Sequence, residues 1–442
     1  MDGQASAPRP GAGWIEHEAR AAILAELHAR PFVPLETPRR VYHFAFATND
    51  DEARADREAI GALIGGAGGA GESADAKFLH FSVGEWDLRW EQHTEFTTYT
   101  WSISRGAQAP FAHPDPVGTG EIAFRPPGRL VVAAHLCVID AATPLEELAG
   151  LFNSQSLCVI GVGRGGAHAL TDFAVDAHGF TRLLIRSRDV SALEVGRLTQ
   201  RLLEIETYRS MALLGLPEAR RAGPELRAME REISGITHAL SQMQDTRTNH
   251  DLLKRLSDLL AASEALSTRT AFRFGASRAY HALVKARLEL VQETKEEPYV
   301  SVSFFFRARL DPAVETCNAL EARQARLSHQ IERATDLMRT GITFEMERQN
   351  RDLLDDMNRR AKLQLRLNRI VQGISIAALA YYISGLFVFV AKGLKDAGLI
   401  PFGLSAEEAT ALGLPLAIGA SWLFMERVRR LSQLAAKEEQ VD

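Results

Sequence analysis

IVQGISIAALAYYISGLFVFVA, residues 370–391, contains no charged side chain, and it decides the architecture of the chain. At the rise of an α-helix, a run of about 22 residues crosses the ~30 Å hydrocarbon layer of a bilayer. A second apolar run, Ala409 to Met425, is about 17 residues long and lies at the short end of the spanning range. Together the two runs predict a membrane hairpin after a large soluble part. The alternative is a buried hairpin of a soluble protein, which must cover an uncharged helix on every side.

Basic residues flank both runs: Arg359, Arg360, Lys362, Arg366 and Arg369 before the first, and Arg427, Arg429, Arg430 and Lys437 after the second. The loop between them has only Lys392 and Lys395 as basic residues. The positive-inside rule therefore predicts cytoplasmic N- and C-termini and an extracytoplasmic loop. Residues 1–13 lack the apolar core of a signal peptide and are expected to be a disordered tail.

The composition is that of a mostly globular intracellular protein. A formal net charge of −5 and a pI near 6.3 lack the basic excess of a nucleic-acid binder, so no nucleic-acid partner is expected. The three cysteines are far apart and odd in number, which predicts reduced thiols rather than a disulfide framework or a zinc site. No cofactor motif is evident, although a divalent metal is compatible with the side chains described below.

The pattern along the chain predicts an α+β/α fold class: a β-rich α/β cytoplasmic domain, a long helical stalk and a two-helix C-terminal transmembrane hairpin. The expected boundaries are a tail at 1–13, the β-rich domain at 14–190, the helical region and stalk at 191–369, the first span at 370–391, the outer loop at 392–408, the second span at 409–425 and a basic tail at 426–442.

Within 14–190, short apolar segments between Gly, Pro and Asp predict mostly antiparallel strands, including one long strand at Asp87–Ser104. Gly161–Gly166 fits a dinucleotide-binding pattern. That fingerprint needs a following helix, whereas a strand-like segment follows here, so a hairpin turn is expected. Tyr299–Arg307 alternates like a strand inside helical surroundings.

After Val190 the apolar spacing becomes helical. Ser191 and Glu194 form a capping box for a helix that Gly215 and Pro217 should end. Further helices are expected at 224–244, at 252–291 and from Ala313 on. The last of these could continue unbroken into the first span. Apolar residues recur along its charged stalk, which favours packing in a homo-oligomer over packing on its own domain.

The first span has two distinct faces. Small residues form one face that permits close helix packing: Gly373, Ala377, Ala380 and Ser384. A neighbouring face could line a pore in a ring of subunits, and its residues are Gln372, Ser375, Leu379, Tyr382, Leu386 and Phe389. Asp396, Glu407 and Glu408 would form acidic rings at the outer mouth of such a pore or remain in a solvated loop.

The most suggestive chemistry in the soluble part is Glu91, His93 and Glu95, which share one face if the segment is a single strand. On that strand Trp90 and Phe96 would point to the opposite side. An imidazole between two carboxylates can bind a divalent metal or act as an acid–base group. An exposed strand face selects the same residue types.

Histidines elsewhere give weaker signals. His28 and Arg30 before Pro31 could hold an anion or simply complement the end of a helix. The isolated histidines His43, His80, His113 and His135 are interpreted as structural.

Four segments carry a family resemblance: Glu26–Phe46, Leu88–Trp101, Arg201–Gly215 and Gln349–Leu386. In these the chain resembles a bacterial family of uncharacterised membrane-anchored proteins, a domain of unknown function. The resemblance implies a bacterial inner-membrane location, with lipid as a partner, and assigns no ligand or catalytic residue. The architecture is also similar to that of CorA-type magnesium channels, which are homopentamers. Their Gly-Met-Asn signature is absent, because Val388-Phe389-Val390-Ala391-Lys392-Gly393 occupies that place.

Three functions follow as hypotheses. The first is a homo-oligomeric channel or transporter-like assembly of CorA-like shape for an unknown ion. The second is a membrane-anchored sensor, scaffold or assembly factor. The third is a membrane-tethered enzyme that uses Glu91, His93 and Glu95.

Overall fold

A computed structural model describes residues 17–20, 23–24, 31–66, 77–104, 110–111, 125–162, 166–241, 246–397 and 406–438. The chain forms two compact units, Met1–Met338 and Arg339–Asp442. The helical segments up to Met338 therefore share a unit with the sheet. Each unit is described by itself.

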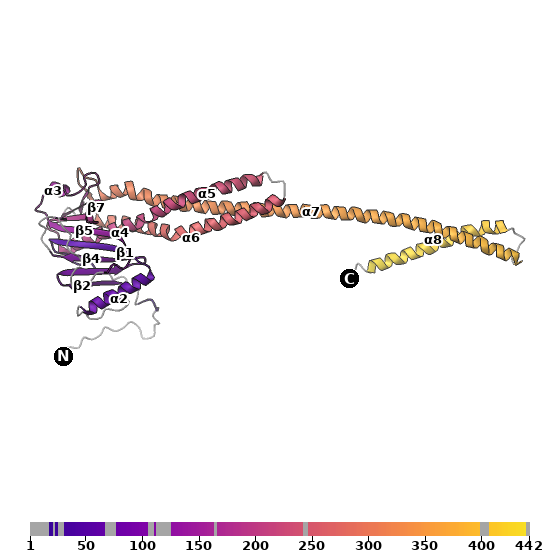
Figure 1. Ribbon diagram of the computed structural model, residues 1–442, viewed down its shortest axis with the longest axis horizontal. Helices are drawn as coiled ribbons and strands as arrows, with labels where there is room; N and C mark the ends of the chain where they lie inside the picture. Colours follow the sequence, from indigo (N-terminus) through magenta and orange to yellow (C-terminus); the bar gives the residue numbers. More distant parts are fainter. Residues whose placement is uncertain are drawn as a thin grey trace, which may run out of the picture. The chain divides into compact units, whose positions relative to one another are not determined.

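The first unit is built on a mixed nine-stranded sheet with the order β2-β3-β4-β1-β5-β8-β7-β6-β9 (Figure 1). Its strands are β1 (Arg39–Ala47), β2 (Phe78–Val83), β3 (Trp86–Gln92), β4 (Phe96–Ile103), β5 (Arg129–Asp140), β6 (Cys158–Val162), β7 (Ala167–Val175), β8 (Thr181–Ser187) and β9 (Thr294–Lys295). Among these strand pairs, β5 and β8 are parallel and the others are antiparallel. The mainly antiparallel pairing agrees with the short connections in the sequence.

The long strand predicted at Asp87–Ser104 is wrong, because a tight turn divides it into β3 and β4. The amide of His93 donates to the carbonyl of Phe96 at 2.9 Å, and the two strands then pair with Trp90 opposite Tyr99. The turn reverses the chain, so Phe96 does not lie on the side of Trp90 as the single-strand pattern required. Phe96 packs in the core under α4, whereas Trp90 packs in the core on the opposite face.

One face of the sheet is covered by helix α4 (Ala192–Leu213) together with α6 (Thr246–Val291) and the start of α7 (Val302–Asp396). The side chains of this core alternate along the strands and recur at helical spacing on the helices, as at Leu198, Leu202 and Ile205 of α4. Ser191 caps α4 by accepting from the amide of Glu194, as the sequence predicts. The sheet is thus held against the helices by a continuous apolar layer.

The opposite face carries an aromatic core that helix α2 (Asp50–Gly66) covers, while α3 (Leu145–Ala149) covers a separate cluster around Leu170. The carboxylate of Asp56 on α2 accepts from the indole of Trp90 at 2.9 Å and from the hydroxyl of Tyr99. The pKa of Asp56 is raised above its usual value, mainly because the carboxyl group is buried. These two bonds fix α2 over the sheet. The sequence pattern did not indicate helix α2.

Helices α5 (Gly215–Ser241) and α6 run beside the first part of α7 (Figure 1). Ion pairs connect α5 to both neighbours, as between Glu232 and Arg255 and between Glu230 and Arg323. The expected start of this helix at Pro224 is wrong. The helix begins at Gly215, because Pro217 lies in its first turn, where a proline costs no hydrogen bond.

The strand pattern at Tyr299–Arg307 is also misleading, because α7 begins within it, at Val302. Val302, Phe306 and Leu310 recur four residues apart and enter the core under the sheet, so helical burial prevails over the local alternation. The helix is 95 residues long and continues through Gly341 to Asp396. It therefore begins before the expected Ala313 and runs unbroken through the uncharged segment at 370–391, as the sequence pattern allowed.

In the second unit, α7 contains a window long and apolar enough to cross a membrane, and 6% of that window is buried. Helix α8 (Ala406–Glu438) contains a shorter apolar stretch at Thr410–Phe424. A Cβ at Gly413 of α8 would lie 2.2 Å from the ring of Phe387 on α7, so the two helices approach closely here. Tyr382, Ser384 and other residues of α7 line a groove beside Thr410 and Leu414.

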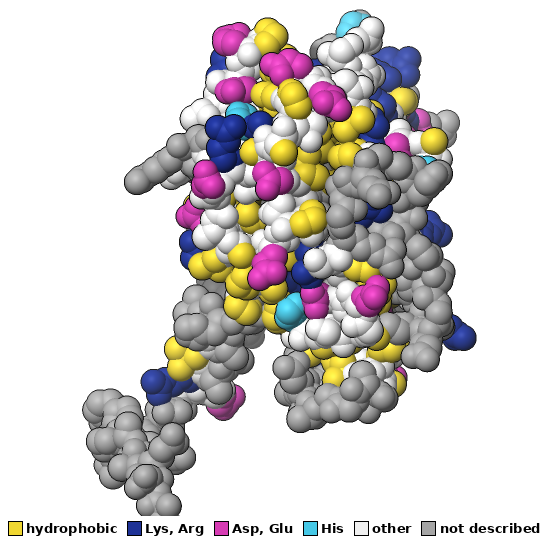
Figure 2. Space-filling model, turned by 90° about the vertical axis from the view of Figure 1, so that its left-hand side faces the viewer, with side chains coloured by type: hydrophobic (Ala, Val, Ile, Leu, Met, Phe, Trp, Pro, Cys, Tyr) yellow, Lys and Arg dark blue, Asp and Glu magenta, His cyan; other side chains and the backbone are white. Residues whose placement is uncertain are grey.

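Figure 2 shows one face of the first unit, where the described acidic, basic and hydrophobic side chains are interspersed. Such mixing is ordinary for a solvated protein surface. The buried side of the sheet is therefore the more informative place to look for a site.

Gly196 of α4 permits a close approach that can be tested. A Cβ at this position would lie 1.9 Å from the carbonyl oxygen of Val33, while the nearby amide of Leu35 donates to the carbonyl of Ala192 at 2.8 Å. Gly196→Ala should therefore reduce the free energy of unfolding by about 1–3 kcal/mol, measured by urea denaturation followed by tryptophan fluorescence. Gly235→Ala on α5 is the matched control. Its Cβ would meet no atom within 4 Å, and helix propensity should raise stability by up to ~1 kcal/mol. Equal changes in the free energy of unfolding for the two variants would contradict the close approach of Gly196 to Val33.

Candidate functional site

A cavity of about 70 Å³ lies between α4 and the sheet face formed by β1, β3 and β4. Its walls combine aliphatic side chains with an unusual number of polar ones. The polar lining includes His43, Arg89, Glu91, His93, Thr98, Thr100, Thr199, Gln200, Glu204 and Thr207. A concave site with an apolar wall and convergent polar groups is the usual form of a small-molecule pocket.

His43 lies on β1 with 5% of its surface exposed and is held between two hydroxyls. Its Nδ1 lies 2.8 Å from Oγ1 of Thr100, and its Nε2 lies 2.9 Å from Oγ1 of Thr207. Thr207 donates its single hydroxyl hydrogen to the carbonyl of Leu203 at 2.9 Å, so it must accept from Nε2. The geometry thus selects the neutral tautomer with hydrogen on Nε2, while Thr100 donates to Nδ1.

Burial, with a smaller contribution from the charges of Arg89 and His93, lowers the pKa of His43 from its usual 6.5 to about 3. The imidazole is therefore neutral at physiological pH. Both ring nitrogens are bonded to threonine hydroxyls, and the ring adds no positive charge to the cavity.

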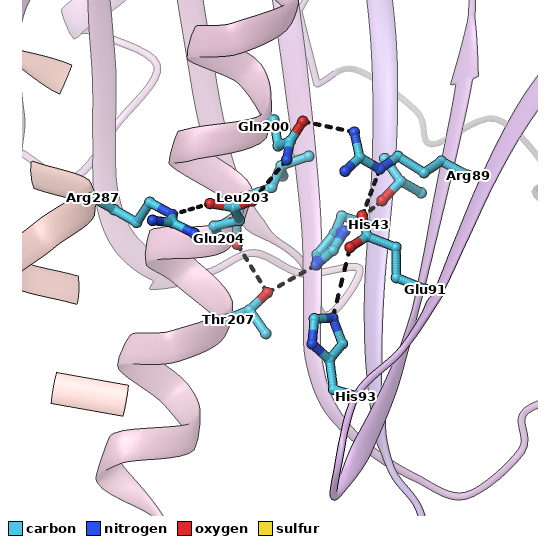
Figure 3. A network of polar contacts seen from close by, with 10 residues as sticks. His43, Arg89, Glu91, His93, Gln200, Leu203, Glu204, Thr207 and Arg287 are labelled. Carbon is cyan, nitrogen blue, oxygen red and sulfur yellow. Dashed lines mark hydrogen bonds and ion pairs between the residues drawn. The ribbon is translucent and has the colours of Figure 1, made fainter. Parts of the chain in front are cut away.

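Arg89 on β3 is the buried cation of the cavity, with 8% of its surface exposed. Its Nε donates to Glu91 at 2.5 Å and its Nη1 donates to Gln200 of α4 at 2.7 Å (Figure 3). Gln200 in turn donates to Glu204 at 2.8 Å, and Glu204 accepts from Arg287 of α6. A continuous polar chain therefore crosses from the sheet through α4 to α6.

Two buried donors in this cavity lack a hydrogen-bond partner within the part of the chain that the structure describes: Nη2 of Arg89 and the hydroxyl of Thr199. Thr199 is 3% exposed, and both residues line the cavity. Leaving a buried donor unpaired costs about 1–3 kcal/mol, and more for a charged group. A molecule with an acceptor oxygen in the cavity would remove that cost.

The structure places two of the three residues predicted as a metal or acid–base site in this cavity. Nε2 of His93 lies 3.8 Å from Oε2 of Glu91, and both side chains line the wall. Glu95 instead accepts two hydrogen bonds of 2.8 Å from Arg273 of α6, in a bidentate ion pair that ties the β3–β4 turn to the helix. An imidazole beside a carboxylate in a cavity can transfer protons. Across the described ranges, no three His, Cys, Asp or Glu side chains are grouped closely enough to hold a metal ion.

The other predicted site residues are distributed over the molecule. His28 and Arg30 lie outside the described residues. The Gly161–Gly166 pattern is followed by β7, which pairs antiparallel with β6, so the hairpin expected in place of a nucleotide-binding helix is confirmed. On α7, Gln372, Ser375 and Leu379 are exposed, as are Gly373 and Ala377. Ser384 donates to the carbonyl of Ala380 at 2.7 Å. Asp396 ends α7, and Glu407 and Glu408 occupy the first turn of α8.

Sequence reasoning missed His43, Thr199 and Gln200. His43 is one apolar-flanked histidine among several, and Gln200 looks like an ordinary helical residue. Only the spacing of Gln200 and Glu204, one helical turn apart, gave a local signal of a polar stripe within an apolar helix face.

A comparison with models of known protein families identifies the family of this chain. A family model described as a protein of unknown function (DUF3422) matches residues 15–431. The chain belongs to the DUF3422 family. No curated protein matches it. The cavity of this DUF3422 protein is therefore interpreted from its own geometry.

Because His43 is buried as a neutral imidazole, we expect the folded protein to lose stability at acidic pH. The folded-state pKa of about 3 lies below the usual 6.5, so the unfolded chain binds more protons between these values. Stability should therefore fall as the pH decreases from about 6.5 toward 3, by up to roughly 5 kcal/mol over the full window. His43→Gln should flatten this dependence.

The measurement is the urea midpoint of the full DUF3422 chain in detergent between pH 7.5 and 5, where most carboxylates stay ionised. His250→Gln, at an exposed position on α6, is the control and should keep the wild-type slope. Identical slopes in wild type and His43→Gln would contradict the buried neutral imidazole.

Proposed function

We propose that this protein is a membrane-anchored sensor whose sheet unit binds a small polar ligand. The observation that carries the proposal is the cavity under α4, where Nη2 of Arg89 and the hydroxyl of Thr199 have no partner among the described residues. A polar, cavity-forming interior is costly for folding alone, because an apolar core would be more stable at this position. A bound ligand would accept hydrogen bonds from these buried donors and so offset the cost of burying them.

The same network offers a way for binding to change the protein. Arg89 holds Gln200 of α4, and Glu204 holds Arg287 of α6, so the sheet and both helices share one chain of hydrogen bonds. A ligand that competes for Arg89 would alter the contact between sheet and helices. Binding energy that differs between two arrangements of these elements would shift their populations.

The membrane anchor is proposed from the apolar window of α7. With 6% of the window buried, its side chains need an apolar environment that lipid supplies. The stretch Thr410–Phe424 of α8, which approaches α7 at Gly413, would form the second span of a hairpin. The basic flanks around Arg369 and Arg427 favour cytoplasmic termini at a bacterial inner membrane.

A homo-oligomer is proposed because the segment before the apolar window exposes large apolar side chains. Phe344, Met346, Leu353, Leu354, Met357, Leu363, Leu365 and Leu367 are each more than half exposed in the single chain. A charged helix with apolar residues along it is typical of a helix that packs against copies of itself.

A second candidate is a channel or transporter-like assembly of CorA-like shape. Its specific support is the order of elements, in which a sheet is followed by helices and then by a 95-residue helix with an apolar end. In a ring, the face with Gln372, Ser375 and Leu379 would line the axis. The groove beside α8 includes Tyr382, Leu386 and Phe389, so a hairpin that keeps this packing would withdraw part of that face from a pore.

Ligand binding is tested by thermal unfolding of the full chain in detergent, in the presence of a library of small anionic, cationic and neutral metabolites. At least one compound should raise the Tm of the wild type, because it binds only the folded cavity. The shift should disappear in Thr199→Leu, which fills the cavity and removes the hydroxyl. Thr237→Val on α5 is the control and should keep it. A library without any stabilising compound would overturn the sensor proposal, as would a shift that survives Thr199→Leu.

The two candidate functions are separated by the mass and symmetry of the protein in nanodiscs, from native mass spectrometry and single-particle images. A sensor should give a dimer or other small assembly without a continuous axial opening. Ala377→Leu should change the assembled mass, since it enlarges the small-residue face, whereas Leu379→Ile keeps the side-chain volume and should not. A closed ring of about five copies around 370–391, together with ion flux in liposomes, would establish the channel instead.

A further inference from the structure

We infer that the cavity under α4 binds a small organic carboxylate, with its head group on Nη2 of Arg89 and the hydroxyl of Thr199 and its body along the aliphatic wall. This inference rests on the proposed ligand-binding function and names the chemical class of the ligand. It follows from three features of the cavity: which donors remain, what the wall is made of, and how the charges are already paired.

The remaining donors select an acceptor oxygen. The guanidinium of Arg89 uses Nε on Glu91 and Nη1 on Gln200, which leaves Nη2 buried without a partner in the described chain. The hydroxyl of Thr199, the residue before Gln200 on α4, is also buried and unpartnered there. A charged donor and a hydroxyl that line the same cavity favour a carboxylate, because hydrogen bonds to ionised groups are about twice as strong as neutral ones.

The wall selects a molecule with an apolar part. Val33, Leu35, Val41, Phe96 and Leu203 line the cavity beside the polar groups. A single water needs about 10–15 Å³ of such space, and the cavity has about 70 Å³, enough for several waters or one short-chain molecule. Water gains nothing along an aliphatic wall, whereas the chain of an organic acid buries apolar surface there.

The charges select a monoanion. The lining carboxylates already have cationic partners: Asp87 pairs with Arg39, Glu91 with Arg89, and Glu204 with Arg287. A cationic ligand would have to compete for acceptors that these arginines occupy. A phosphate dianion would bring two charges to a guanidinium that is shared with Glu91, in a cavity where His43 stays neutral. One carboxylate oxygen matches the one nitrogen of Arg89, Nη2, that has no partner in the described chain.

The test compares three probes of one shape on the full chain in nanodiscs, by isothermal titration calorimetry: butanoate, butanamide and butylammonium. Butanoate should bind at least tenfold more tightly than the amide, and butylammonium should not bind. Thr199→Val keeps the shape and every ion pair of the site, and it should weaken butanoate about tenfold. Thr237→Val, whose hydroxyl bonds to the carbonyl of Ile233 in α5, should leave the affinity unchanged.

Arg89→Met should abolish binding of butanoate, and its folding is checked by the melting temperature because Glu91 loses a partner. If that variant does not fold, Thr199→Val and the amide comparison carry the decision. Equal affinity for butanoate and butanamide would overturn the carboxylate class. If no probe binds while a library compound without a carboxylate stabilises the protein through Thr199, the class is wrong and the sensor function stands. If nothing binds at all, both proposals are wrong.

Discussion

The structure depends on the packing of α4 against the sheet. The apolar side chains of this interface belong to a core cluster that also includes residues of α6 and α7. Gly196 of α4 lies against the backbone of Val33, in the segment that precedes β1, and both residues also line the cavity. Close packing and a polar cavity thus occur side by side along one helix.

The polar groups at this interface are arranged to satisfy one another almost completely. His43 has a hydroxyl at each ring nitrogen, and Arg89 reaches across to Gln200 and onward to α6. In a low-dielectric interior such networks rigidify a domain when they are complete, and an unpaired member is costly. Nη2 of Arg89 and the hydroxyl of Thr199, which line the cavity and lack partners among the described residues, therefore mark the part of the network that a ligand would complete. Glu95 lies outside this chain of contacts, and both of its carboxylate oxygens accept from Arg273.

The architecture joins this sheet unit to a chain segment of different chemistry. The same helix, α7, contributes Val302 and Phe306 to the core under the sheet and carries the apolar window nearer its other end. For a sensor this continuity is useful, because a change at α4 and α6 acts on helices that pack beside α7, as at Ser263 and Ser328.

The sequence by itself determined the features that depend on local composition. The uncharged run at 370–391, the capped helix after Ser191 and the strand that follows Gly161–Gly166 needed only periodicity and residue type, because their causes act within one segment. Tertiary structure decided the rest. The pattern around Glu91 could not show that the chain turns at His93, and it could not place Glu95 on Arg273, 178 residues away. The contacts that make the cavity, His43 with Thr207 and Arg89 with Gln200, join residues 164 and 111 positions apart. Which elements pack together decides whether a buried histidine is neutral and whether one nitrogen of a buried arginine lacks a partner among the described residues. Local sequence does not encode that packing.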